Sequence, residues 1–272
     1  MRWMLALLAA ISWTAAAGFV DLTCLDWSPD GQYMLFAQAG ALYVGQAPNG
    51  RDPVRVTPEA AQVTWGRFGP SSEWFVFATP AEGGYALWRG RIGEEPEELY
   101  FSPHPIFQPA VAPGGEVVAF LSERDGQRDI FLVDLASGEE EQLTRTPFQE
   151  ACPDFSPTGD LLLFVGLWPD EADGSWDLFI IDLQTGGIEQ LTADSFFDWG
   201  ARFSPDGEWI AFETDRGGRS DIYVVRKDGT DLTPFTYDPW RDAFPAWSPE
   251  GDRIAFASRR SDGWVILAEG TY

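Results

Sequence analysis

The chain has 272 residues, of which 44% are apolar and 15% aromatic, enough to build the core of one sizeable domain. It carries 18 Lys and Arg residues against 43 Asp and Glu residues, a formal net charge of −25 at pH 7. Binding to nucleic acid or to anionic lipid head groups relies on clustered positive charge, so this balance argues against both as partners.

The first predicted element along the chain is a secretory signal peptide, residues 1–17. Arg2 gives it a positive start, residues 4–12 are apolar, and three alanines precede Gly18. The apolar stretch is too short to span a bilayer comfortably. We therefore expect cleavage after Ala17 and a periplasmic or secreted protein that is not inserted in a membrane. The alternative is that the segment is retained as an N-terminal anchor.

Residues 18–272 repeat one phrase six times: an anchor residue, usually aromatic, followed by a short reversal rich in Pro and Gly. The anchors lie about 41 to 48 residues apart. The phrases begin at Trp27, Phe68, Val111, Phe155, Phe203 and Trp247. A period in this range with a strand-like interior predicts one all-β domain, a radial array of small sheets.

Each repeat reads as four strands. The first ends at the anchor, and Ser-Pro-Asp-Gly then reverses the chain: Pro fixes φ, Asp bonds its own backbone, and Gly accepts positive φ. The second strand is apolar and closes on a Phe, as at Phe36 and Phe164. The third begins at Asp in three repeats (Asp129, Asp177 and Asp221), for which we predict a structural hydrogen bond or ion pair. A hairpin leads to a fourth strand that ends in Thr. Six such units predict a six-bladed β-propeller.

Ring closure is predicted from the two ends of the repeat array. After Trp247 the last unit supplies three strands, without the closing strand that ends in Thr. Phe19–Thr23, ahead of the first anchor, ends in Leu-Thr. We expect this segment to complete the sixth blade and to protect its edge.

The phrase from Ala246 to Phe256, Ala-Trp-Ser-Pro-Glu-Gly-Asp-Arg-Ile-Ala-Phe, resembles the WD40-like PD40 repeat of TolB-type six-bladed β-propellers. The resemblance covers the chain from about Phe19 onward. It implies an envelope or secreted module that binds a protein or peptide. Some propellers of this kind accompany an α/β or a hydrolase domain, and we expect neither here, so neither activity is carried over.

Catalytic motifs are scarce in this sequence. The one histidine, His104, cannot by itself form a His-cluster metal site, and no Gly-x-Ser-x-Gly motif is present. We expect a non-catalytic protein without a cofactor. The alternatives are a carbohydrate-active or small-ligand-binding propeller, including a lyase or hydrolase, and a calcium-stabilised structural module. For the last, the acidic hairpin with Asp170, Glu171 and Asp173 offers a weak calcium motif.

The two cysteines occupy the same position in different repeats. Cys24 and Cys152 each stand three residues before an anchor, in the first and fourth units. Those blades are opposite one another in a six-blade ring, whereas a disulfide needs Cα atoms within about 7 Å. We predict two unpaired thiols.

The candidate binding surface is formed by the connections that lead into blades four, five and six. Each carries an aromatic residue seven positions before the anchor and an acidic residue five before it. The candidate residues are Phe148, Glu150, Phe196, Phe197, Asp198, Trp199, Trp240, Arg241 and Asp242. Aromatic side chains with a few polar groups suit a protein, peptide or glycan ligand, bound here by a monomer. Alternatively, these loops pack on each other and the acidic residues brace turns.

Overall fold

The computed structural model describes residues 22–58, 61–124, 126–167, 175–261 and 263–271. Over these residues the chain forms 23 β-strands and no helix. None of the described residues therefore forms a helix that could cross a membrane.

The strands fall into six antiparallel sheets, the blades, each built from strands consecutive in the sequence. Blade one comprises β1 Leu22–Trp27, β2 Tyr33–Gln38, β3 Ala41–Gln46 and β4 Arg51–Arg55. Blade two comprises β5 Gly66–Phe68, β6 Phe75–Ala81, β7 Gly84–Gly90 and β8 Glu97–Ser102. Blade three comprises β9 Phe107–Val111, β10 Val117–Arg124, β11 Gln127–Asp134 and β12 Glu140–Gln142. Blade four comprises β13 Gln149–Phe155, β14 Leu161–Leu167, β15 Trp176–Asp182 and β16 Ile188–Gln190. Blade five comprises β17 Asp198–Phe203, β18 Trp209–Thr214, β19 Asp221–Arg226 and β20 Thr233–Pro234. Blade six comprises β21 Arg241–Trp247, β22 Arg253–Arg260 and β23 Gly263–Gly270.

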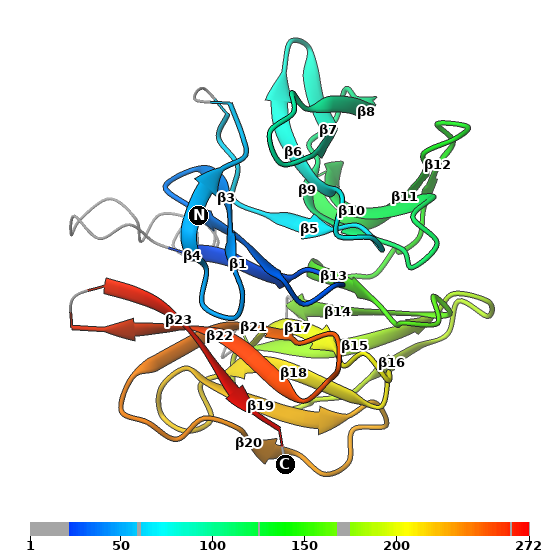
Figure 1. The fold of residues 1–272 in the computed structure, drawn as a ribbon. Coiled ribbons are helices and arrows are strands. Elements are labelled where there is room, and N and C mark those ends of the chain that lie inside the picture. The colour runs from blue at the N-terminus through cyan, green and yellow to red at the C-terminus, as the bar shows by residue number, and fades with distance from the viewer. Residues whose placement is uncertain (1–21, 59–60, 125, 168–174, 262, 272) are drawn as a thin grey trace.

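The blades form a ring around their first strands. β1 lies against β5, β5 against β9, β9 against β13, β13 against β17, and β17 against β21. The ring closes where β21 lies against β1 (Figure 1). The predicted six-bladed propeller is confirmed.

The closing strand is corrected. Leu22 and Thr23 lie in β1, where Leu22 pairs with Gln38 of β2 in the first blade. In blades one, three, four and five a Thr follows the fourth strand and stands eleven residues before the next anchor, as Thr192 precedes Phe203, whereas Thr23 stands only four before Trp27. The Leu-Thr ending was therefore out of register. Residues 19–21 lie outside the described residues, and the described part of the sixth blade has three strands.

The Ser-Pro-Asp-Gly reversals hold the first two strands of each blade together. In the first, Ser28 Oγ accepts the Tyr33 N–H at 2.8 Å and donates to Asp30 Oδ1 at 2.7 Å. Gly31 has φ +75° and donates its N–H to Ser28 O at 2.9 Å. A residue with a Cβ is strained at this φ, so the turn favours Gly.

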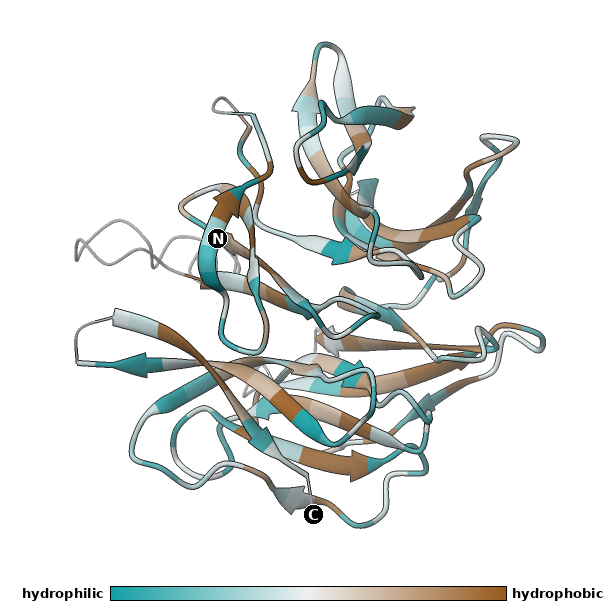
Figure 2. Ribbon diagram, viewed as in Figure 1, coloured by the Kyte–Doolittle hydropathy of each residue, from teal (hydrophilic) through white to brown (hydrophobic). Residues whose placement is uncertain are grey.

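The core lies within and between the blades. The Phe that closes each second strand is buried in all six, from Phe36 at 5% exposure to Phe120, Phe164 and Phe212 at 0%. In Figure 2 hydrophobic residues run along the middle strands, and hydrophilic residues gather at the hairpins. The fold therefore leaves the connecting loops as the variable surface.

Candidate functional site

The connections into blades four, five and six lie beside the hairpins that join the second and third strands of these blades. The Phe197 N–H donates to Asp215 Oδ1 at 2.9 Å, so the β16–β17 loop contacts the β18–β19 hairpin. The Asp242 N–H donates to Ser220 O at 2.9 Å, and the same hairpin thus contacts β21. We call the surface formed by these loops and hairpins the loop face.

The three predicted acidic residues, Glu150, Asp198 and Asp242, are not on that surface. Each is fully buried at the start of the first strand of its blade. The Thr that ends the preceding fourth strand stands beside each of them, and its hydroxyl accepts an N–H from the third strand: Ile130 N to Thr144 Oγ1 at 2.8 Å, Leu178 N to Thr192 Oγ1 at 2.9 Å and Ile222 N to Thr236 Oγ1 at 3.0 Å. Their place in the structure is that of braces between consecutive blades.

Glu150 shows the bracing arrangement most completely. Its carboxylate accepts the Ile130 N–H at 3.0 Å and the hydroxyls of Thr144 at 2.5 Å and Thr146 at 2.7 Å. Burial raises its pKa to about 7, against the lowering effect of the two Thr hydroxyls. A carboxylate with three internal donors and no exposure is not available to a ligand. Glu150 is therefore corrected from surface residue to interior brace.

Asp198 is paired with an arginine that connects it to the loop face. The Arg216 guanidinium contacts Asp194 at 2.7 Å and Asp198 at 3.1 Å. Burial raises the pKa of Asp198 to about 6, and the charge of Arg216 opposes this rise. Carboxylate oxygens of Asp177, Asp194 and Asp198 lie within 4.8 Å of one another, the spacing of a cation site. Arg216 supplies the positive charge that such a cluster requires.

Asp242 repeats the arrangement in the sixth blade. Ser258 Oγ donates to its Oδ1 at 2.5 Å, and burial raises its pKa to about 6. The side chain faces inward between blades five and six. The Asp198 and Asp242 side chains therefore lie in the interior and do not form part of the exposed surface.

The predicted aromatic residues divide between interior and surface. Phe148 is 4% exposed and stacks on Phe179 with ring centroids 4.8 Å apart, so it belongs to the core and is also corrected. Phe197 and Trp199 are half-buried and stack at 5.6 Å. Phe196 is 37% exposed, and the Arg216 guanidinium lies 5.5 Å from the centre of its ring. Phe196 is thus held at the loop face by a cation–π contact.

Trp240 and Arg241 occupy the same face in the sixth blade. The Arg260 guanidinium lies 5.2 Å from the Trp240 ring centre and pairs with Asp238 at 2.8 Å. The Arg241 side chain is 54% exposed and contacts Glu213 at 3.1 Å. Tyr237, 73% exposed, stands next to this group in the sequence. The face therefore presents aromatic rings and guanidinium groups on an otherwise acidic protein.

The sequence pattern also has a match among known protein families. The model of the TolB beta propeller domain, PD40, matches residues 91–270. The chain belongs to this family.

Several known proteins are similar to this TolB-type propeller in sequence or in fold. An uncharacterised protein of Agrobacterium fabrum is 26% identical over 240 residues, which cover 87% of this chain and 66% of that protein. The chain thus spans just under two thirds of this relative. TolB from Acinetobacter baumannii has a TM-score of 0.69 at 16% identity, covering 98% of this chain and 68% of that one. An oligogalacturonate lyase in complex with manganese has a TM-score of 0.62 at 14% identity, covering 95% and 94%. At these identities the two solved structures show the shared fold alone.

The centre of this TolB-type propeller holds a largely buried charged network that was not among the predicted site residues. Arg202 contacts Asp26 at 2.5 Å and Asp154 at 3.0 Å, joining blades one, four and five. Asp26 also accepts the Phe68 N–H at 2.7 Å, and Asp154 accepts the Phe203 N–H at 2.9 Å. Each of these charged residues stands directly before an anchor. That register position was the available signal, and it places them around the axis.

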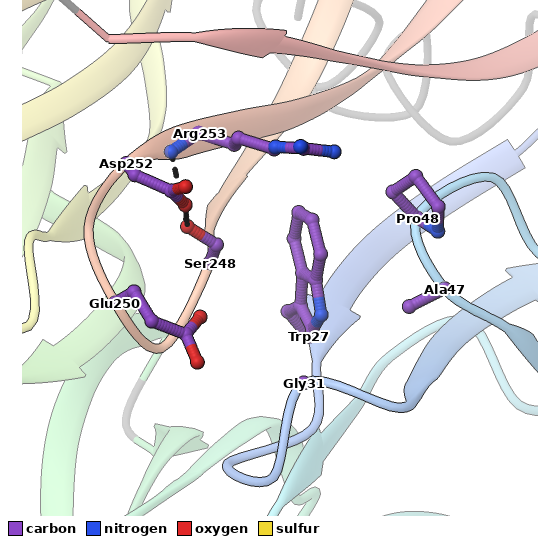
Figure 3. A pocket seen from close by; sticks show the side chains of 8 residues that line it. All are labelled: Trp27, Gly31, Ala47, Pro48, Ser248, Glu250, Asp252 and Arg253. Carbon is purple, nitrogen blue, oxygen red and sulfur yellow. Dashed lines mark hydrogen bonds between the residues drawn. The ribbon is translucent and has the colours of Figure 1, made fainter.

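A pocket of about 250 Å³ opens at the seam between blades one and six, lined by Trp27, Gly31, Ala47, Pro48, Ser248, Glu250, Asp252 and Arg253 (Figure 3). Trp247 donates its indole N–H to Arg202 O at 3.2 Å across the preceding seam. The buried indole N–H of Trp27, at the equivalent position, has no partner among the described residues. This seam is therefore less tightly joined than its neighbour.

The remaining predicted residues fall outside the loop face or outside the described residues. His104 is exposed in the β8–β9 connection, where its N–H donates to Ser102 Oγ at 3.1 Å. Cys24 and Cys152 are free and buried in blades one and four, as their register predicts. The hairpin with Asp170, Glu171 and Asp173 lies outside the described residues, so the calcium motif stays a prediction.

Proposed function

We propose that this protein is an exported, non-catalytic propeller that binds a protein or peptide partner through the loop face of blades four to six. The observation that carries the proposal is the combination of Phe196, Trp240 and Arg241 on one face of a rigid scaffold. Trp, Tyr and Arg dominate the energetics of protein interfaces because they bury large areas while keeping a polar group available.

The buried braces favour a preorganised surface. Glu150 accepts the Ile130 N–H of the preceding blade, Asp198 pairs with Arg216, and Asp242 accepts a hydrogen bond from Ser258, so the start of each of these first strands is anchored to its surroundings. The guanidinium groups of Arg216 and Arg260 lie against the rings of Phe196 and Trp240, respectively, and restrict their orientation. A surface ordered before binding loses less side-chain entropy when the partner docks.

Export is part of the proposal. It is supported by the predicted signal peptide in residues 1–17 and by membership of the TolB beta propeller family. The Arg241 side chain, 54% exposed on the loop face of an acidic protein, suits a partner whose docking segment is apolar with an acidic position opposite this arginine.

The test is quantitative affinity capture with the full-length protein exported by its host. Changing Phe196 and Trp240 to Ala should reduce the recovered partner at least tenfold, measured by isotope-labelled mass spectrometry. The matched control is Trp209→Ala, because Trp209 also lies under an arginine, Arg226, with 4.5 Å between guanidinium and ring centre. Trp209 follows the Ser-Pro-Asp-Gly turn at the opposite end of its blade. Equal recovery by all variants would refute the loop face as the binding surface.

A further inference from the structure

The outer edge of the sixth blade differs from that of the other five. In blades one to five the third strand is covered by a fourth, as β11 is covered by β12 and β15 by β16. β23 is the outermost strand of the sixth sheet over the described residues (Figure 1). A strand in this position presents a row of backbone N–H and C=O groups to pairing.

The side chains of β23 are correspondingly uncovered. The residue of each third strand equivalent to Ile266 is completely buried in every other blade: Leu42, Leu87, Ile130, Leu178 and Ile222 are all at 0% exposure. Ile266 is half-buried, and the adjacent Val265 is 37% exposed. The sixth blade thus leaves uncovered an apolar position that its siblings bury.

In four of the other blades the backbone N–H at this position has a side-chain hydrogen-bond acceptor. The N–H groups of Leu42, Ile130, Leu178 and Ile222 each donate to the hydroxyl of the Thr that ends the fourth strand, at 2.8 to 3.1 Å. By register, the Ile266 N–H takes the place of these donors. A strand that completes the sixth blade should therefore carry an apolar residue followed by Thr.

The mature N-terminus proposed above is too short to supply this strand. β1 begins at Leu22, so cleavage after Ala17 leaves residues 18–21 ahead of it. The shortest connection between a fourth strand and the next blade is residues 103–106, between β8 and β9. A connection of that length would use all of residues 18–21. In the register of the sibling blades, the strand itself would fall within residues 12–16, inside the predicted signal peptide.

We propose that β23 binds an extended segment of the protein partner by β-strand addition, completing the sixth blade. The segment ends in an apolar residue followed by Thr, as the fourth-strand segments of blades one, three, four and five do at Val56-Thr57, Leu143-Thr144, Leu191-Thr192 and Phe235-Thr236. This inference rests on the proposed function, since it requires both removal of the signal peptide and a protein partner. Main-chain hydrogen bonds supply affinity in this mode, and the Ile266 site supplies selectivity.

A partner strand suits this edge better than a second copy of the chain. Two copies would each bring a net charge of about −25 to the junction, which opposes association. In addition, β23 itself carries no Thr that could accept the Ile266 N–H of a second molecule.

The experiment uses the full chain expressed with its own leader, whose N-terminus is first determined by mass spectrometry. The probe is a fluorescent peptide with the sequence of residues 187–193, Gly-Ile-Glu-Gln-Leu-Thr-Ala, which contains β16. We expect saturable binding by fluorescence anisotropy, weakened at least tenfold when the Thr of the peptide is replaced by Val. Ala268→Pro should weaken it equally, because this substitution removes an outward N–H of an edge strand. Trp209→Ala, outside both β23 and the loop face, should leave it unchanged.

The outcomes separate the two proposals. A protein that begins at Gly18 but binds neither peptide overturns β-strand addition and leaves the loop face standing. A retained leader overturns β-strand addition by a partner, since residues 12–16 would then be present to complete the sixth blade, and it leaves the loop face standing. Equal binding of the Thr and Val peptides also overturns the inference, as does a dimer in analytical ultracentrifugation that Ala268→Pro abolishes. The thermal melt of Ala268→Pro must match wild type, and Val265→Lys provides a second edge variant if it does not.

Discussion

At the scale of single residues, the position five before each anchor is a buried position that accepts two kinds of side chain. Blades four to six carry Glu150, Asp198 and Asp242 there, all at 0% exposure. Blades one to three carry Leu22, Val63 and Ile106, at 4%, 1% and 2%. Burial at all six positions is therefore a property of the blade register, and the carboxylates depend on internal hydrogen bonds to offset their lost hydration.

Glu150→Gln should change how stability depends on pH. Burial raises the native pKa of Glu150 from 4.5 to about 7, so the folded protein holds a proton that the unfolded chain releases. The resulting stabilisation is fully present below pH 4.5 and is lost as pH rises to about 7, by roughly 3 kcal/mol at most. Gln keeps the acceptor for Ile130 and cannot ionise.

Urea unfolding of wild type and Glu150→Gln at pH 5 and pH 8 measures this effect. We expect similar free energies of unfolding at pH 5 and a more stable variant at pH 8. The control is Glu139→Gln at an exposed position of blade three, which should leave the difference between the two pH values unchanged. A variant that loses equal stability at both pH values would show that Glu150 acts only through its shape.

The two thiols should be unreactive in the folded protein. Burial raises the pKa of Cys24 to about 11 and that of Cys152 to about 12, and the thiolate is the reactive form. Iodoacetamide at pH 8 should label neither cysteine in the native state and both in 6 M guanidinium without reductant. Labelling that appears only after reduction would instead demonstrate a disulfide.

Residue types and their spacing predicted the aromatic and acidic positions of the site but not which of them are exposed. Exposure depends on what the next blade places above a side chain, and that is a long-range property. The predicted structural hydrogen bonds of the third-strand aspartates are present in two blades, where Gln142 donates to Asp129 and Gln190 donates to Asp177. Both partners lie on the adjacent fourth strand.

At the scale of elements, the first strand of most blades contains a bulge that the sequence pattern does not show. In blades three to six the residue three before the anchor has positive φ: Gln108 at 45°, Cys152 at 53°, Gly200 at 63° and Phe244 at 56°. The pairing register shifts at the same point in each of these blades. A bulge increases local twist, which suits strands that converge on a narrow axis.

A Gly at a position of positive φ can indicate a bulge in the sequence, but only one of these four positions is Gly. The bulges were therefore not predicted. The predicted second strands, by contrast, match β2, β6, β10, β14, β18 and β22 closely. Those strands are apolar on both faces because neighbouring blades cover them. They can therefore be recognised in the sequence as uninterrupted apolar runs.

Gly200→Ala tests the cost of the bulge. A Cβ at Gly200 would meet no atom closer than Pro245 Cδ at 4.0 Å, so the cost is confined to the backbone conformation. We expect a loss of about 1 kcal/mol in the free energy of unfolding, and a smaller loss for Gly200→Asn, since Asn tolerates positive φ. Chemical denaturation provides the measurement. Losses that follow side-chain volume, with Asn worse than Ala, would show crowding and contradict the backbone explanation.

At the scale of the whole molecule, the residues directly before the anchors form a ring around the axis. In blade order these are Asp26, Arg67, Ala110, Asp154, Arg202 and Ala246. An acid, a base and an alanine are thus repeated twice, so opposite blades carry residues of the same type. Arg202 bonds to the two opposite aspartates, and Arg67 lies close enough to feel the charges of both. The centre is a charged junction that ties distant blades together.

Arg202→Met should therefore destabilise the entire propeller. The variant leaves Asp26 and Asp154 buried near each other without their shared cation, although the Met side chain fills much of the same volume. Removing one member of a buried ion pair costs about 3–5 kcal/mol. Differential scanning calorimetry should show a single transition at lower temperature, since the junction joins blades one, four and five.

The double variant Arg202→Met, Asp154→Asn separates lost charge balance from lost packing. It leaves one carboxylate, that of Asp26, to balance the Arg67 guanidinium, it retains an acceptor for the Phe203 N–H, and it should recover most of the lost stability. The surface pair Lys227 and Glu208, 2.8 Å apart and half exposed, serves as control. Lys227→Met should cost less than about 1 kcal/mol because exposed ion pairs contribute little. A double variant no more stable than Arg202→Met would show that the arginine acts through its packing, and the charged junction would not be what holds opposite blades together.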